Sequence, residues 1–263
     1  MIFILSLGMS AAHVFVSPHF DDAIGSCGGT IARLVSRGQP VRVVTVFGGP
    51  ERLPFSFPAQ VLHKEWELDL PVAHRRREDA KACELLGCEQ AVLEIPDAIY
   101  RQDAAGRHLY PTFESLREPP APADERLMGM IASALEASLV DSGTVLYFPL
   151  GIGAHVDHIL TKECGRVLAA RHIVVSYRDF AYDRAWDGRI DDASARRLNV
   201  ALTEQELTAK RAAFSAYRSQ IVDLFTCDDS MNAYFETIGR HESLFLPGQM
   251  LLEDSSRLRS LLA

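Results

Sequence analysis

The chain has 263 residues, of which 48% are hydrophobic and 24% are charged, a composition typical of folded proteins and not of disordered or fibrous ones. Its formal net charge is −8, from 35 acidic and 27 basic residues, which argues against a general nucleic-acid binder or a protein that adheres to anionic membranes. The sequence contains no internal repeat or low-complexity linker. We therefore predict a single domain over residues 1–263.

The cysteines and the first residues bear on the cellular compartment. Five cysteines make an odd number and form no Cys-x-x-Cys pair, so a disulfide scaffold and a thiolate zinc site are both disfavoured. Residues 1–12 are apolar but lack the basic start of a signal peptide, and we interpret them as an N-terminal extension. No other stretch approaches the roughly 20 apolar residues of a membrane-spanning helix. We expect a cytoplasmic protein without a membrane span.

Strand and helix signals alternate along the chain. Short apolar, β-branched runs predict strands at 13–17, 41–47, 91–95, 144–149 and 173–177. Helical spacing of apolar residues predicts helices at 31–37, 73–87, 126–139, 159–170 and 203–224. This alternation predicts a Rossmann-like, doubly wound α/β fold, with a mostly parallel sheet covered by helices on both faces. Residues 97–125 contain four prolines and little periodicity, so we expect them to form a surface loop excursion.

Two polar clusters follow predicted strands. Pro18-His19-Phe20-Asp21-Asp22 comes after the first strand, and His155-Val156-Asp157-His158 comes after the fourth. Open α/β sheets bind ligands in the crevice at the carboxyl ends of their strands. The three histidines and three aspartates offer nitrogen and oxygen ligands without a thiolate, which suits a catalytic zinc site with three protein ligands and one water.

The spacing inside the first cluster suggests separate roles for its members. His19 and Asp22 are three residues apart, so both can point at one ion in a helical turn while Asp21 stays free to act as a base. Taken alone, either aspartate could simply cap the following helix, and His155 and His158 could be surface loop residues. Short motifs often match by chance, but two clusters at strand ends strengthen the metal interpretation.

These motifs resemble those of the PIG-L and LmbE-like zinc-dependent N-acetylglucosamine deacetylases. The first family motif, Pro-His-x-Asp-Asp with a later Gly-Gly, corresponds to residues 18–22 and Gly28-Gly29, and the second, His-x-Asp-His, corresponds to residues 155–158. Weaker similarity extends over residues 13 to about 240. Many members have Glu after the second Asp of the first motif, whereas this chain has Ala23. That departure bears on which substrate the protein acts on more than on which reaction it catalyses.

The resemblance implies His19, Asp22 and His158 as ligands of Zn²⁺, although such a site also accepts other divalent ions such as Fe²⁺. Zinc held by three protein groups makes a nucleophile of its bound water near neutral pH. Asp21 is then the implied general base, and a protonated His155 would stabilise the tetrahedral intermediate and protonate the leaving amine. We predict that Asp157 bonds to His155 and raises its pKa, with loop capping as the alternative.

Further residues are candidates for binding the substrate. Arg75 matches an arginine that contacts sugar hydroxyls in the family, although it also belongs to a run of three arginines with an ordinary solvated interpretation. Asp97 and Arg101 are predicted substrate-binding residues with the same ambiguity, since Pro-Asp is also a common turn. Tyr182 and Trp186 could stack on a sugar ring, or anchor a loop.

The lead hypothesis is a metal-dependent amidohydrolase that removes an acetyl or other short acyl group from an amino sugar or its conjugate. A metal-dependent phosphoesterase or nuclease is one alternative, although a second ion would need more carboxylates. A non-catalytic sugar- or metal-binding protein is another. Gly25, Gly28 and Gly29 lack the Gly-x-Gly-x-x-Gly order, so we predict no nucleotide cofactor. The expected partner is a small amino-sugar substrate, not nucleic acid, and a homo-oligomer remains open.

Overall fold

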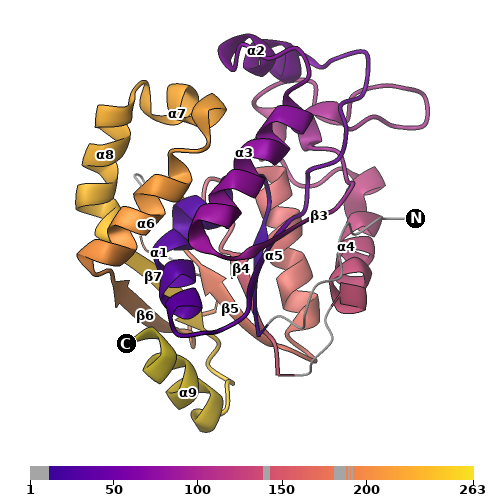
Figure 1. Cartoon of the computed structure of the whole chain (residues 1–263). Helices are drawn as coiled ribbons and strands as arrows, with labels where there is room; N and C mark the ends of the chain where they lie inside the picture. Colours follow the sequence, from indigo (N-terminus) through magenta and orange to yellow (C-terminus); the bar gives the residue numbers. More distant parts are fainter. Residues whose placement is uncertain (1–11, 139–142, 181–187, 189, 191) are drawn as a thin grey trace.

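A seven-stranded sheet with the order β3-β2-β1-β4-β5-β7-β6 forms the centre of the computed structural model (Figure 1). The structure describes residues 12–138, 143–180, 188, 190 and 192–263. The strands are β1 His13–Ser17, β2 Val41–Thr45, β3 Glu89–Val92, β4 Val145–Pro149, β5 Ile173–Tyr177, β6 Arg196–Ala201 and β7 His241–Leu246. The β1 to β5 pairings are parallel, whereas β7 runs antiparallel to both β5 and β6. The predicted doubly wound, mostly parallel α/β fold is confirmed.

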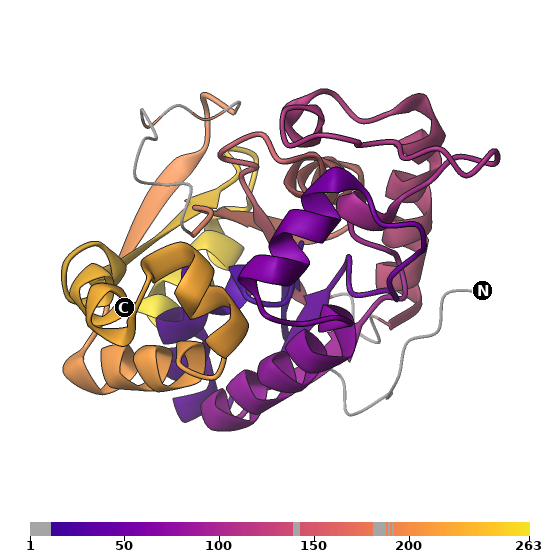
Figure 2. The ribbon, with the colours of Figure 1, turned by 90° about the horizontal axis from the view of Figure 1, so that it is seen from above.

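Helices cover both faces of this sheet. They are α1 Asp22–Ser36, α2 Phe57–Glu65, α3 Pro71–Leu86, α4 Glu125–Ser138, α5 Val156–Leu168, α6 Glu204–Phe214, α7 Arg218–Phe225, α8 Asp228–Thr237 and α9 Leu252–Leu262. Helices α1, α3, α6, α8 and α9 pack into one hydrophobic cluster, and α4 and α5 pack into the other. Figure 2 shows α6 to α8, in orange, beside α3, in purple. Among the described residues, no helix combines the length and apolarity needed to cross a membrane.

The alternation of side chains along the inner strands explains why both faces are apolar. In β1, Phe15 belongs to the α1 side of the sheet, where it stacks on Tyr147 of β4 with ring centroids 4.1 Å apart. Val14 and Val16 belong to the opposite side, with Phe148. A parallel strand covered on both faces is rich in apolar residues on both sides. The first and fourth strands could therefore be predicted from the sequence.

Helix α1 begins nine residues earlier than the apolar spacing from Ile31 predicts, at Asp22, the last residue of the first motif. Gly25, Gly28 and Gly29 therefore lie inside the helix. A Cβ on Gly25 would come within 2.5 Å of the Phe180 ring, and one on Gly29 within 2.3 Å of Leu202. Both glycines are needed because other parts of the chain approach the helix closely at these positions.

The helix predicted over residues 203–224 is in fact two helices. Helix α6 ends at Phe214 and α7 begins at Arg218. Tyr217, at the break, is buried and donates a hydrogen bond of 2.6 Å from its hydroxyl to Asp79 of α3. The apolar spacing continues across the break, so the sequence alone favours one helix.

Residues 97–125 form a surface excursion only in part. Residues 104–107 are exposed, but Tyr100 and Tyr110 are almost fully buried and belong to the hydrophobic cluster on the α4 side of the sheet. Arg101 in this segment is buried too, and its guanidinium forms ion pairs with Asp124 and Asp157. The segment contains three short 3-10 helices, Ala98–Tyr100, Ser115–Arg117 and Pro122–Asp124, and side-chain bonds hold it against the rest of the molecule.

Candidate metal centre and active site

The two polar clusters meet at the carboxyl edge of the sheet. Strands β1 and β4 are parallel neighbours, and the chain continues from β1 to β2 on one side while β5 follows β4 on the other. This point, where the strand order reverses, is where open α/β sheets form their ligand crevice. The segments after β1 and β4 therefore converge, although more than a hundred residues separate them.

Three of the predicted ligands lie together. Oδ2 of Asp22 is 3.3 Å from Nδ1 of His19 and 3.3 Å from Nε2 of His158. The candidate ligand atoms of these three residues all lie within 4.8 Å of one another, and Asp22 and His158 are buried. The arrangement gives two nitrogens and one carboxylate oxygen, a donor set that zinc and several other divalent ions accept.

A buried carboxylate contacts the other nitrogen of each imidazole. His19 Nε2 is 3.1 Å from Oδ2 of Asp157, and His158 Nδ1 is 2.7 Å from Oδ1 of Asp179. Such partners hold a metal-binding histidine in one tautomer and one orientation. The nitrogens left over are those nearest Asp22, so the residues present fit a single divalent ion.

The electrostatics agree with a site built for a cation. Burial opposes the charged form of His158, but Asp22 and Asp179 raise its pKa to about 10. Burial likewise disfavours a charged Asp22, yet His158 and His19 hold the pKa of Asp22 well below its usual range. These groups thus favour positive charge between them, which a divalent ion supplies when it replaces the protons.

Asp21 is not one of the grouped ligands, although it lines the same cavity. Its Oδ1 is 3.0 Å from Nη2 of Arg75, whose guanidinium stands 4.7 Å from the centre of the Trp66 ring. Burial, followed by repulsion from Asp22, raises the pKa of Asp21 to about 6, although Arg75 lowers it. A carboxylate with a pKa near neutrality is suited to accept and return a proton.

The predicted contact between Asp157 and the His155 ring is wrong. The Asp157 carboxylate contacts His19 and Arg101, at 3.1 and 2.6 Å. Only the backbone N–H of Asp157 reaches His155, donating to Nδ1 at 3.2 Å, because His155 is the N-cap of α5. Burial lowers the pKa of His155 to about 3, although the Asp157 charge raises it in the predicted direction. With Nδ1 accepting a backbone N–H, these contacts favour a neutral ring protonated at Nε2 over the predicted cation.

The predicted substrate-binding residues separate into two groups. Arg75 and Asp97 line the cavity beside the metal cluster, and Oδ2 of Asp97 is 3.5 Å from Nε2 of His19. Arg101 is buried and is absent from the described cavity wall. Its guanidinium is already engaged by Asp124 and Asp157, so the structure corrects its predicted contact with substrate.

The cavity has a volume of about 340 Å³, within the usual range for small-molecule sites. Its lining includes the polar side chains of His19, Asp21, Asp22 and His155. A second, more apolar part of the lining comes from three separate parts of the chain and is called the outer wall below. These residues are Leu62 and Trp66 at α2, Phe113, Leu116 and Arg117 in the 97–125 segment, and Gln220, Asp223 and Leu224 on α7.

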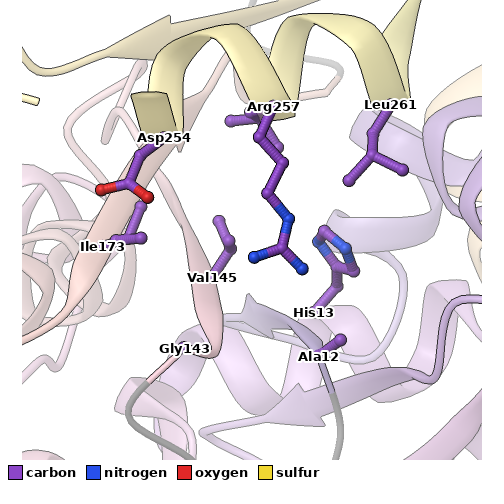
Figure 3. Close-up of a pocket in the computed structure, with 9 residues that line it drawn as sticks. Ala12, His13, Gly143, Val145, Ile173, Asp254, Arg257 and Leu261 are labelled. Atoms are coloured by element: carbon purple, nitrogen blue, oxygen red, sulfur yellow. The ribbon is translucent and has the colours of Figure 1, made fainter. Parts of the chain in front are cut away.

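A second cavity lies at the opposite, amino end of the sheet, beneath α9 (Figure 3). Its volume is about 30 Å³, close to the space that one water occupies. His13 in its wall is already bonded to the Tyr147 hydroxyl at 2.9 Å. This cavity is too small for a sugar, so the candidate active site is the one at the carboxyl edge.

Asp179 and the α7 residues are parts of the site whose roles the sequence did not predict. Asp179 follows the end of β5 by two residues, a position comparable to that of the two motifs after β1 and β4. That placement was the available signal, but a single aspartate carries no spacing pattern. Tyr182 and Trp186, the predicted stacking residues, lie outside the described residues.

Comparisons with known proteins agree with this geometry. The model of the PIG-L family, described as GlcNAc-PI de-N-acetylase, matches residues 14–170, which include both motifs. A 2'-N-acetylparomamine deacetylase of Niallia circulans is 34% identical over 230 residues, covering 81% of this chain and 82% of that protein. The crystal structure of the zinc-inhibited form of a teicoplanin deacetylase is 25% identical with a TM-score of 0.76, covering 89% of this chain and 96% of that one. The chain therefore belongs to the PIG-L family of metal-dependent N-deacetylases.

Proposed function

We propose that the protein hydrolyses the N-acetyl group of an amino sugar within a small biosynthetic conjugate, at a single metal ion held by His19, Asp22 and His158. The observation that carries this proposal is the convergence of these ligands, each imidazole backed by a carboxylate, beside a cavity that Asp21 lines. Relatives named for 2'-N-acetylparomamine and teicoplanin support the substrate class. Zn²⁺ is the proposed ion, with Fe²⁺ as the substitute to test.

The first chemical role belongs to Asp21. His19, Asp22 and His158 would hold a divalent ion, which when bound would supply Lewis acidity toward the amide carbonyl and lower the pKa of water toward about 7. Asp21 takes a proton from the attacking water while the new carbon–oxygen bond forms. Arg75, 3.0 Å from its carboxylate, keeps that carboxylate oriented. The raised pKa of Asp21 then lets it return the proton to the nitrogen as the carbon–nitrogen bond breaks, giving acetate and a free amine.

The second role belongs to His155. Because Nδ1 accepts the Asp157 N–H, the neutral ring has an N–H donor at Nε2, and the ring lines the cavity. A neutral donor can stabilise the negative charge that develops on the carbonyl oxygen. His155 then acts as a hydrogen-bond donor throughout the reaction, and the proton delivered to the amine comes from Asp21.

The alternative functions are less well supported. Two-ion phosphoesterases need two separate ligand sets, but the two His/Asp groups found among the described residues share His19, and Arg101 engages Asp157 in the second. A non-catalytic binding protein has no need for a carboxylate of raised pKa, and Asp21 is one in the cavity lining.

The test measures acetate release from a panel of N-acetylated amino sugars by the purified protein, before chelation, after chelation and after reloading with Zn²⁺ or Fe²⁺. We expect chelation to abolish turnover and reloading to restore it. His158→Ala should bind less than one equivalent of metal and show no turnover. Full activity in the chelated protein, or in His158→Ala, would exclude the proposed metal-dependent reaction.

A further inference from the structure

Arg101 is connected to the metal cluster through Asp157 and is absent from the described cavity wall. Its guanidinium forms ion pairs with two carboxylates at once, with Nη1 2.6 Å from Asp157 Oδ1 and Nε 2.8 Å from Asp124 Oδ2. Nη1 also donates to the carbonyl oxygen of Pro96 at 3.1 Å. Only 5% of Arg101 is exposed, so a substrate in the cavity cannot contact it without rearrangement of the site.

The contacts continue from Arg101 to a proposed metal ligand. The Asp157 side chain is fully buried. Its Oδ1 forms an ion pair with the Arg101 guanidinium but no hydrogen bond, while its Oδ2 is 3.1 Å from His19 Nε2 and accepts the Ala98 N–H at 3.0 Å. The ion pair on one oxygen and the hydrogen bonds on the other hold the carboxylate against the His19 ring.

We propose that Arg101 is a positioning residue, which raises the metal affinity of the site by holding Asp157 against His19. This inference rests on the proposed metal centre. Partners of metal-bound histidines change metal affinity when they are removed, typically by about 10- to 100-fold. Arg101 stands one residue further out and would act through Asp157.

The surroundings of Arg101 explain why this position needs an arginine. The guanidinium lies 5.0 Å from the Phe47 ring centre and 5.2 Å from that of Tyr110. A planar group with donors in fixed directions can fit between these rings and still reach two carboxylates, whereas a lysine ammonium cannot match that shape. Tyr110 also donates to Asp124 at 2.8 Å, which fixes the outer carboxylate.

The same arrangement couples the metal centre to the wall of the substrate cavity. Asp97 and Ile99 precede Arg101, and Phe113 and Leu116 follow it, in the 97–125 segment, and all four line the cavity. The Arg101 ion pairs therefore attach this wall to His19 through Asp157. We expect a substitution of Arg101 to affect His19 more than the cavity wall, because only Asp157 lies between Arg101 and His19.

The experiment compares the Zn²⁺ affinity of the wild type, Arg101→Gln and Arg33→Gln by competition with a chromophoric chelator. Arg33→Gln is the matched control, since it makes the same substitution at a buried arginine that pairs with Glu206 and leaves the Arg101–Asp157 pair intact. We expect Arg101→Gln to bind Zn²⁺ about 10-fold more weakly and Arg33→Gln to stay within about 2-fold of the wild type. Equal affinities of Arg101→Gln and the wild type, with a raised KM, would overturn the inference in favour of a substrate contact.

Arg101→Lys keeps the proposal testable if Arg101→Gln does not fold, as judged by circular dichroism of the metal-free protein. Lysine retains the charge but not the paired geometry, so we expect an affinity between those of the wild type and Arg101→Gln. Wild-type affinity in Arg101→Lys would overturn the inference alone. If the wild-type protein binds no Zn²⁺, or if His158→Ala binds Zn²⁺ as tightly as the wild type, the proposed metal centre on which this inference rests would be overturned instead.

Discussion

Residues 14–170 and 171–263 contribute to the proposed active site in different ways. The first region, which the family model matches, supplies His19, Asp21, Asp22 and His158 from two short motifs at strand ends. The second region supplies Asp179 and part of the outer cavity wall, each without a motif. The chemistry is therefore concentrated in local patterns, whereas its orientation and its access depend on single residues positioned by tertiary packing.

Buried polar groups hold the second region against the first. Glu242 of β7 accepts the backbone N–H groups of Gly29 and Thr30 in α1, at 2.9 and 2.7 Å, and pairs with Lys210 of α6 at 2.7 Å. Helix α7 is attached in a similar way, since Ser219 donates its N–H and its hydroxyl to Glu78 of α3. These bonds place α7 at the cavity and β7 beside β5, so the orientation of the site depends on contacts remote from the metal ligands.

The largest expected effect tests the chemistry of the first region. Asp21→Asn should lower kcat by about 10³-fold, because positioned acid–base groups contribute roughly 10²- to 10⁴-fold. The metal content should remain near that of the wild type, since Asp21 lies outside the ligand cluster. Stopped-assay kinetics and metal analysis on the same preparation measure both. Retention of wild-type kcat would remove Asp21 from the mechanism.

The next effect concerns the attachment of the two regions. Lys210→Met leaves the Glu242 carboxylate buried without its ammonium partner, which should cost about 3 kcal/mol of unfolding free energy. The double variant Lys210→Met with Glu242→Gln should recover part of this loss, because the unpaired charge is gone. Urea unfolding measures both. Lys81→Met, in an exposed pair with Glu84, is the control and should change stability by less than about 1 kcal/mol.

A smaller effect tests whether the second region orients a metal ligand that the first region supplies. Asp179→Asn should weaken Zn²⁺ binding by about 10-fold or more, because the carboxylate 2.7 Å from His158 Nδ1 no longer fixes that ring. Chelator competition provides the measurement. Asp229→Asn, on the exposed first turn of α8, should leave the affinity unchanged. Equal affinities of the two variants would show that the second region does not influence the metal centre.

The contrast between the regions also explains what the sequence could predict. The parallel strands and the meeting of their polar loops follow from local apolar runs and from the rule that ligands bind at strand ends. The partner of Asp157 does not follow, because adjacency in sequence favours His155. In the structure the N-cap geometry of α5 leaves the Asp157 carboxylate to contact His19 of the other loop.

The features that the sequence did not predict also depend on residues distant in the chain. The break between α6 and α7 depends on Tyr217 reaching Asp79, a residue of α3, and apolar spacing contains no information about that partner. The burial of Arg101 depends on carboxylates 23 and 56 positions further along the chain, at Asp124 and Asp157. Periodicity and motifs report on neighbours in sequence, so interactions of this kind become visible only when the fold is known.

The smallest expected effect tests whether α7 controls access without taking part in the chemistry. Leu224 lines the cavity, whereas Val222, two positions earlier, is exposed and is absent from the described wall. Leu224→Ala removes apolar surface that contributes about 1 kcal/mol to the binding of a sugar. KM should therefore rise about 5-fold, while kcat should stay within about 2-fold of the wild-type value. Val222→Ala should change neither constant. A fall in kcat for Leu224→Ala at unchanged KM would mean that the second region acts on the transition state, and the division between chemistry and access would then not hold.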